Sequence, residues 1–312
     1  MRWASNQYRM TRRRLVASFS DWLELFRAGN CVTGLVGVFL GATLALETIP
    51  SGDEARITLL LGLSVYAFMA SWNALNDYLD LNIDKVNQPG RPIPSGRISI
   101  SSARNGILLM MAISLGSLAQ GGLIASGLTE DFSSWYPAVF IWLAAILLLV
   151  NYESIGSVTL GLKERGLPGN LAISLSVGLV VLFGAAGVFD PWNQRAVSLF
   201  FIGTLYNLAR EIIKDIEDME GDEGRNTFAM RVGAEKARAV AWAILLVTMI
   251  ALISPFALNV FPDIHLILMA PALFTLTVVK KHLFLAEDTA AQKMTKKSMI
   301  LALIGILISA LV

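Results

Sequence analysis

Nine apolar stretches recur along this chain, and each has the length of a helix that crosses a lipid bilayer. A hydrocarbon core of ~30 Å requires roughly 17–25 residues of helix. The stretches cover residues 29–47, 57–75, 104–126, 137–155, 170–189, 197–214, 236–259, 263–280 and 295–312. This pattern predicts an all-α integral membrane protein whose nine transmembrane helices form a bundle, as a single domain over residues 1–312.

The composition agrees with a chain that resides in a bilayer. Hydrophobic residues make up 55% of it and charged residues only 16%, which lies well outside the range of soluble domains. The formal net charge of +1 gives no indication of a nucleic-acid partner. The single cysteine, Cys31, cannot form an internal disulfide, and with only His265 and His282 beside it a zinc site is not expected. A metal in this protein should therefore have oxygen ligands.

The basic residues lie almost entirely on one side of the predicted helices. Of the 25 lysines and arginines, 23 fall on the side of the N-terminus, and only Arg56 and Arg195 fall on the other. By the positive-inside rule, this asymmetry predicts a cytoplasmic N-terminus and a C-terminus on the far side. Residues 1–26 then form a basic cytoplasmic segment, and residues 76–103 and 215–235 form two long cytoplasmic cap loops. Those loops should carry the chemistry, because the loops on the far side are short.

The same acidic pattern, D-x-x-D-x-x-x-D, marks both long loops. It occurs at the ends of the second and sixth apolar stretches, as Asp77, Asp80, Asp84, Asp215, Asp218 and Asp222. Each residue of the second copy follows its counterpart by 138 positions. This constant spacing indicates an internal repeat.

If the helices continue through the motifs, the acidic residues of each motif line one helical face. The two faces carry Asn76, Asp80 and Asp84, and Glu211, Asp215, Asp218 and Asp222. Brought together, they would place at least five carboxylates in one cavity. At an effective dielectric of ~20 and ~5 Å separation, each like-charge pair costs about 3 kcal/mol, so cations must neutralise the set. Oxygen ligands with room for water and phosphate are those that Mg²⁺ prefers.

Basic residues accompany both motifs. Lys85, Arg91, Lys214 and Arg225 lie close to the acids in the sequence, and their side chains can bind phosphate oxygens directly. Acids together with bases predict a site for Mg²⁺ and a diphosphate.

The plain alternative for each motif is a solvated helix end whose acids balance nearby lysines and arginines. The repetition of the motif argues against that interpretation. For Asp77, Asn73 and Glu217 individually, a structural role and a functional one stay equally open, because such side chains also cap helices or position their neighbours.

The first motif resembles the N-D-x-x-D-x-x-x-D signature of the UbiA superfamily of intramembrane prenyltransferases, and residues 218–222 resemble its second signature, D-x-x-x-D. The likeness extends to residues 91–96, to Leu162-Lys163 and to residues 166–170, so it covers nearly the whole chain. Within the superfamily, residues 210–222 look like the archaeal digeranylgeranylglyceryl phosphate synthases. Those enzymes build ether lipids from geranylgeranyl diphosphate and geranylgeranylglyceryl phosphate.

The resemblance implies an enzyme that uses Mg²⁺ to move a prenyl group from an isoprenoid diphosphate to a lipid-soluble acceptor in the bilayer. By resemblance, the two Mg²⁺ ions are held by Asn76, Asp80 and Asp84 and by Asp218 and Asp222, with Asp215 assisting. Arg91 and Lys163 would contact the diphosphate. Arg27 and Asn30, at the start of the first helix, match a polar pair that lies near the acceptor in the family.

Other interpretations stay open. Repeated halves with acids in the membrane also mark ion-coupled transporters, although acids at helix ends beside long loops argue against that class and against a non-catalytic scaffold. Within the superfamily, an aromatic or chlorophyllide-type acceptor is the main alternative to a glycerol lipid. The chain departs from the family between Tyr152 and Leu162, where residues 155–161 form an apparent insertion, so Tyr152 receives no catalytic role.

Overall fold

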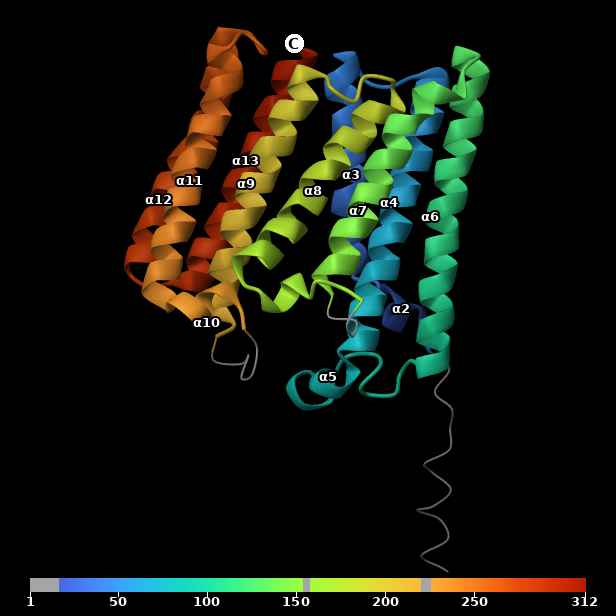
Figure 1. Ribbon diagram of the computed structural model, residues 1–312. Helices are drawn as coiled ribbons and strands as arrows, with labels where there is room; N and C mark the ends of the chain where they lie inside the picture. The colour runs from blue at the N-terminus through green and yellow to red at the C-terminus, as the bar shows by residue number, and fades with distance from the viewer. Residues whose placement is uncertain (1–16, 154–157, 220–225) are drawn as a thin grey trace, which may run out of the picture. The chain divides into compact units, whose positions relative to one another are not determined.

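The computed structural model (Figure 1) describes residues 17–153, 158–219 and 226–312, and every regular element in these ranges is a helix. Nine of the described helices are long and apolar enough to cross a membrane. They are α3 (Ala28–Leu46), α4 (Gly52–Leu79), α6 (Ile100–Thr129), α7 (Tyr136–Tyr152, after the 3₁₀ turn η2, Phe132–Trp135), α8 (Leu167–Gly187), α9 (Gln194–Glu217), α11 (Ala234–Ala257), α12 (Ala270–Phe284, after η4, Asp263–Met269) and α13 (Asp288–Leu311). The shorter helices are α2 (Phe19–Leu25), α5 (Leu81–Asn87), η3 (Leu162–Glu164) and α10 (Phe228–Val232). The predicted all-α class and the count of nine are confirmed for the described residues.

Several helices extend beyond the apolar stretches that predicted them. α4 begins at Gly52, ahead of the predicted start at residue 57, and α9 continues to Glu217, past the predicted end at residue 214. Charged residues end the hydropathy signal without ending the helix. An acid such as Asp53 in the first turn of α4 is favoured there by the helix dipole. Of the described motif residues, Asp77, Asp84 and Asp215 lie in helices, and Asp80 and Asp218 lie at helix ends.

The described residues divide between two compact units. Among the described residues, unit 1 contains residues 17–32 and 66–114, and unit 2 contains residues 33–65 and those that follow residue 114. The first acidic motif belongs to unit 1 and the second to unit 2. Each unit has its own buried cluster of apolar side chains.

In unit 1, α2 packs on the loop after α5 and on the first turn of α6. Leu25 is fully buried in a cluster with Ile93, Ile98 and Ala103. The burial of these side chains holds the polar loop after the first motif against the helices.

Arg97 ties that loop to α2. Its guanidinium pairs with Asp21 and, at 2.8 Å, with Glu24. Hydrogen bonds with Ser18, which caps α2, and then with Arg97 lower the pKa of Asp21, and the hydrogen bond from Arg97 lowers the pKa of Glu24. Both carboxylates are therefore ionised at neutral pH. Their contribution to stability is present above their ordinary pKa values and is lost as pH falls through the lowered ones.

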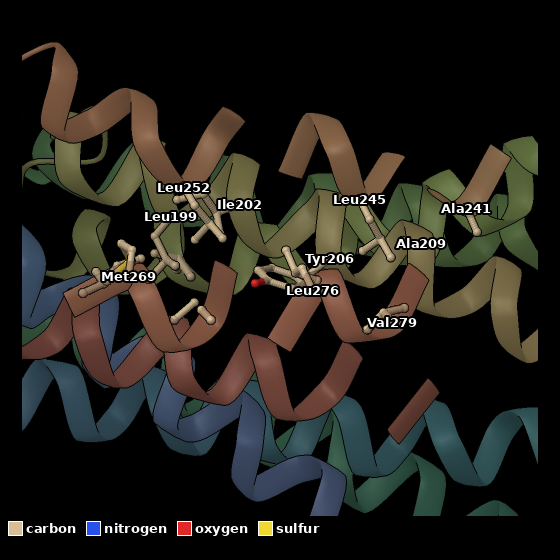
Figure 2. Packing of buried hydrophobic residues seen from close by; sticks show 14 of the residues in the cluster. Leu199, Ile202, Tyr206, Ala209, Ala241, Leu245, Leu252, Met269, Leu276 and Val279 are labelled. Carbon is tan, nitrogen blue, oxygen red and sulfur yellow. The ribbon is translucent and has the colours of Figure 1, made fainter. Parts of the chain in front are cut away.

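In unit 2, α9 lies at the centre and packs against α8, α11 and α13 (Figure 1). Leu199, Ile202 and Tyr206 of α9 belong to one buried cluster with Leu245 of α11 and Leu276 of α12 (Figure 2). Because α9 also carries the second acidic motif at its C-terminal end, this packing determines where that motif lies within the unit.

A chain of hydrogen bonds crosses the apolar core of unit 2. The Tyr206 hydroxyl lies 2.7 Å from Ser298 Oγ, and Ser298 donates to the carbonyl of Ala272 at 2.7 Å. Because the one hydroxyl proton of Ser298 goes to Ala272, Tyr206 must be the donor to Ser298. The chain joins α9, α13 and α12, as polar side chains commonly do between membrane helices.

Within unit 2, α3 and α8 approach each other closely because glycines face the partner backbone. A Cβ at Gly41 would overlap the carbonyl oxygen of Val181, and a Cβ at Gly184 would overlap the carbonyl oxygen of Val38. Small residues allow this kind of backbone contact between membrane helices. The two contacts are reciprocal, so an added methyl group on either helix forces the backbones apart.

Gly184→Ala should therefore destabilise the folded protein, since overpacking of this kind costs about 1–3 kcal/mol. The matched control is Gly116→Ala on α6, because a Cβ at Gly116 meets no atom within 4 Å. There the higher helix propensity of alanine should leave stability equal or slightly raised. Thermal unfolding in detergent compares the two variants with the parent protein. Equal midpoints for Gly184→Ala and Gly116→Ala would contradict the close contact.

Candidate active site

The first acidic motif lies where α4 passes into α5. Asp80 is the junction residue, and with a ψ of 6° it interrupts the helix between Leu79 and Leu81. The Asp80 N–H donates to the Asn76 carbonyl at 2.9 Å, and the Asp84 N–H donates to the Asp80 carbonyl at 2.8 Å. Asn76 and Asp80, and likewise Asp80 and Asp84, are therefore about one helical turn apart, although the single continuous helix that the sequence analysis assumed is interrupted at Asp80. Their side chains offer only oxygen and amide groups, which suit Mg²⁺.

Arg91, from the loop after α5, brings positive charge to this motif. Its Nη1 donates to Asp84 Oδ2 at 2.7 Å and lies 3.3 Å from Asp77 Oδ1. Arg27 Nη2 donates to the same Asp77 oxygen at 2.7 Å. Both carboxylates are 4% exposed, whereas the side chains of Arg27 and Arg91 are 36% and 33% exposed. The structure thus brings together Arg27, Arg91 and Asp84 from the predicted site, with Asp77 as the link.

The turn between α2 and α3 delivers Arg27 to this network. Arg27 itself adopts a φ of 49°, in the left-handed region that non-glycine residues seldom occupy. Asn73 of α4 donates to the carbonyl of Phe26 at 3.0 Å, and the Cys31 thiol donates to the same carbonyl at 3.2 Å. Asn73, whose role the sequence left open, therefore holds this turn against α4.

The second acidic motif begins inside α9. Asp218 caps that helix, and its N–H donates to the Lys214 carbonyl at 2.9 Å. Asp215 accepts a hydrogen bond at 2.9 Å from Nδ2 of Asn170, a buried residue in the first turn of α8. A side chain from a neighbouring helix therefore orients one carboxylate of this motif.

A corner between η3 and α8 carries a second positive group of the predicted site. Lys163 Nζ lies 3.4 Å from Glu153 Oε2 at the end of α7, and Glu153 is 2% exposed. Gly166 has a left-handed φ of 72°, and a Cβ at Gly169 would lie 2.5 Å from the Leu162 carbonyl oxygen. Both glycines are needed for the chain to turn this tightly. In Figure 1, η3, α10 and the last turn of α9 lie at the same end of unit 2.

The remaining predicted residues are exposed or lie outside the described ranges. Lys85 on α5 and Lys214 on α9 are exposed, and Asn30 is exposed in the first turn of α3. Asp222 and Arg225 lie outside the described residues.

Two polar residues of this region were not predicted from the sequence. The sequence does mark Glu153 as unusual, because it is the one charged residue in the apolar stretch 137–155. Asn170 belongs to the run 166–170, which resembles the family, but the sequence offered no partner for it. Each contacts a predicted site residue: Glu153 accepts a hydrogen bond from Lys163, and Asn170 donates one to Asp215.

Among the residues that the structure describes, no three Asp, Glu, His or Cys side chains gather closely enough to hold a metal ion. Asp84 is paired with Arg91, and the predicted ligand Asp222 is outside the described ranges. The two motifs also belong to different units. Their meeting in one cavity and the Mg²⁺ ligand sets stay predictions.

Comparisons relate the chain to known proteins. The family model described as the UbiA prenyltransferase family matches residues 32–304. A digeranylgeranylglyceryl phosphate synthase of Methanosarcina mazei is 34% identical over 303 residues, which cover 93% of this chain and 98% of that protein. A solved structure of a digeranylgeranylglyceryl phosphate synthase has a TM-score of 0.72 at 27% identity and covers 94% of this chain and 98% of that one. A UbiA homologue from Archaeoglobus fulgidus bound to GPP and Mg²⁺ has a TM-score of 0.58 at 16% identity, covers 91% of this chain and 99% of that one, and supports the fold alone.

The pairing of Glu153 with Lys163 should be measurable as a coupling energy. Glu153→Gln leaves a cation beside a buried amide, and we expect it to lower the free energy of unfolding by about 1–3 kcal/mol. Lys163→Gln in the same chain should restore part of that loss. The exposed pair Asp53 and Arg56 is the control cycle, with side chains 41% and 73% exposed, and its coupling should be below about 1 kcal/mol. Additive effects of the Glu153 and Lys163 substitutions on the unfolding midpoint would contradict the pairing.

Proposed function

Because the chain belongs to the UbiA prenyltransferase family, we propose that it transfers a geranylgeranyl group from its diphosphate to geranylgeranylglyceryl phosphate, in a reaction that requires Mg²⁺. The observation that carries this proposal is the similarity to digeranylgeranylglyceryl phosphate synthases along nearly the whole chain, 93% in the case of the Methanosarcina mazei enzyme. The protein is a multi-pass membrane protein, and its product is an ether lipid that stays in the bilayer.

We assign the metal-binding role to the oxygen side chains of the two motifs. One Mg²⁺ would be held by Asn76, Asp80 and Asp84 and the other by Asp218 and Asp222, with Asp215 assisting. Bound there, Mg²⁺ would neutralise the negative charge that develops on the departing diphosphate. The hydrogen bonds from the Asp80 N–H to the Asn76 carbonyl and from the Asp84 N–H to the Asp80 carbonyl support the first set, because they keep successive members about one helical turn apart.

Basic side chains complete the proposed diphosphate site. They are Arg91 and Lys163, with Lys85, Lys214 and Arg225 nearby in the sequence. Their N–H groups donate to the diphosphate oxygens as the bond between the prenyl carbon and the diphosphate oxygen breaks. Arg91 and Lys163 each contact a buried carboxylate, and this supports the assignment because a held cation loses less freedom when substrate binds.

The acceptor supplies the nucleophile. Its hydroxyl oxygen forms the new ether bond to the prenyl carbon, and its proton passes to a base. An acceptor that carries a phosphate group needs positive charge of its own, and Arg27 beside Asn30 is suited to this role because its side chain is 36% exposed. The apolar faces of the helices bind the prenyl tails, at about 0.8 kcal/mol for each buried CH₂ group.

Product analysis tests this proposal. We expect purified protein in detergent, given geranylgeranyl diphosphate, Mg²⁺, geranylgeranylglyceryl phosphate and hydroxybenzoate together, to produce only the ether lipid by mass spectrometry. EDTA should abolish the product and excess Mg²⁺ should restore it.

Asp218→Asn should lower kcat by a factor on the order of 10² or more, because it removes charge that acts in the transition state. Asp263→Asn, at an exposed acid remote in sequence from both motifs, is the control.

Two results would contradict separate parts of the proposal. Prenylation of hydroxybenzoate alone would show that the acceptor is aromatic. The proposed prenyl donor and the requirement for Mg²⁺ would be unaffected. Full activity in the presence of EDTA would show that the acidic motifs do not act through Mg²⁺.

We also propose that the N-terminus faces the cytoplasm, on the basis of the 23 basic residues, out of 25, that fall on that side of the helices. A cysteine introduced as Ser95→Cys should react with an impermeant reagent only from the cytoplasmic side, and Ser51→Cys only from the opposite side. Both serines are exposed, whereas the native Cys31 is fully buried and should give little background. The reverse labelling pattern would place the acidic motifs in the other compartment.

A further inference from the structure

A single carboxylate oxygen holds two arginines of unit 1. Oδ1 of Asp77 lies 2.7 Å from Arg27 Nη2 and 3.3 Å from Arg91 Nη1, so these two nitrogens are at most about 6 Å apart. The Asp77 side chain is 4% exposed, and each arginine is about a third exposed. The acid is thus enclosed while the two bases keep access to solvent or substrate.

The backbone is arranged to make this contact. Asp77 follows Asn73 by one helical turn, so both lie on the same face of α4. Asn73 donates a hydrogen bond to the carbonyl of Phe26. Asp77 accepts one from the side chain of Arg27, which directly follows Phe26 in the chain. The left-handed φ of 49° at Arg27 shows that this turn adopts a conformation that costs energy. The hydrogen bonds from Asn73 and to Asp77, both on α4, hold the turn in this conformation.

Asp77 does not share the face of the predicted metal ligands. It follows Asn76 directly, and consecutive residues point about 100° apart around a helix. Asn76, Asp80 and Asp84 lie at successive turns, whereas Asp77 lies off that row. Arg91 nevertheless joins the two sets, because its Nη1 contacts both Asp84 and Asp77.

Two guanidinium groups at this distance repel each other unless an anion lies between them. Asp77 is that anion, and Asp84 balances the second charge through its 2.7 Å contact with Arg91. Each guanidinium has five N–H donors in a planar fork, and the contacts described above use one terminal nitrogen of each. The remaining donors of a closely spaced arginine pair match the oxygens of a phosphate group.

We propose that Asp77 is a positioning residue that holds Arg27 and Arg91 side by side as one binding group for a substrate phosphate. This inference rests on the proposed function, in which both substrates carry phosphate, and it revises one part of that proposal. Arg27 and Arg91, assigned above to different substrates, here bind the same one. The ligand chemistry is the same for the diphosphate of the prenyl donor and the phosphate monoester of the acceptor. The experiment distinguishes the two sources.

Steady-state kinetics of Asp77→Asn with each substrate varied in turn is the main test. Loss of the carboxylate lets the arginines separate, so the KM of the substrate that they bind should rise roughly tenfold or more, with a much smaller change in kcat. Asp77→Glu, which keeps the charge, should recover part of this loss. The matched control is Asp53→Asn at the other end of α4, where an exposed acid pairs with Arg56 and both KM values should stay unchanged.

Arg27→Gln and Arg91→Gln provide a second test that stands even if Asp77→Asn fails to fold. If the two arginines act as one group, both variants should raise the KM of the same substrate. If the variants affect different substrates, or if Asp77→Asn folds and keeps the KM values of the parent protein, the proposal is wrong. A lower kcat with unchanged KM would assign Asp77 to another role and would also overturn it.

A binding measurement separates this inference from the proposed function. Inorganic pyrophosphate and glycerol 3-phosphate serve as probes of the two phosphate groups, and the shift in thermal midpoint of the full-length protein in detergent reports their binding. At least one probe should stabilise the parent protein, and Asp77→Asn, or the two arginine variants, should reduce that shift severalfold. Equal shifts in all variants would overturn the inference. An absence of prenyl transfer in the parent protein, with these shifts intact, would overturn only the proposed function.

Discussion

A carboxylate that is removed from water must keep a positive charge beside it, and this requirement determines how the helix ends are built. Asp77, Asp84 and Glu153 are each 2–4% exposed, and each contacts an arginine or a lysine. Removing one partner of such a pair leaves a buried charge that costs several kcal/mol. The helices supply the acids and the connecting segments supply Arg91 and Lys163, so each ion pair fastens a connection to a helix end.

The same pairs prepare the chemistry that we propose. A cation that a buried carboxylate already orients does not have to be ordered when the substrate arrives, and such preorganised charge is a main source of rate enhancement in enzymes. Asn170 acts in a comparable way on Asp215, through a hydrogen bond of 2.9 Å. Under the proposed function, stability and catalysis would therefore depend on the same contacts at these helix ends.

The sequence was sufficient for the features that depend on local pattern. Apolar length predicted the nine membrane helices of the described residues, and the spacing of Asn76, Asp80 and Asp84 predicted their separation of about one helical turn, although not the interruption of the helix at Asp80. The choice of ion-pair partners depends on contacts that no local pattern encodes. Arg27 and Asp77 are 50 positions apart, and Arg91 was assigned to phosphate without its bond to Asp84. The observed ends of α4 and α9 also differ from the predicted ones, because charged residues end an apolar stretch in the sequence without ending the helix.

The reciprocal contact of α3 and α8 has a consequence for how such a chain can change over generations. Gly41 and Gly184 each face a backbone carbonyl of the other helix, so neither can be replaced alone without moving a whole helix. Outward positions of α3, such as Val36, which is 54% exposed, can exchange among apolar residues at little cost. Sequence drift within a lineage should therefore accumulate on the lipid-facing side of these helices, while the two glycines persist.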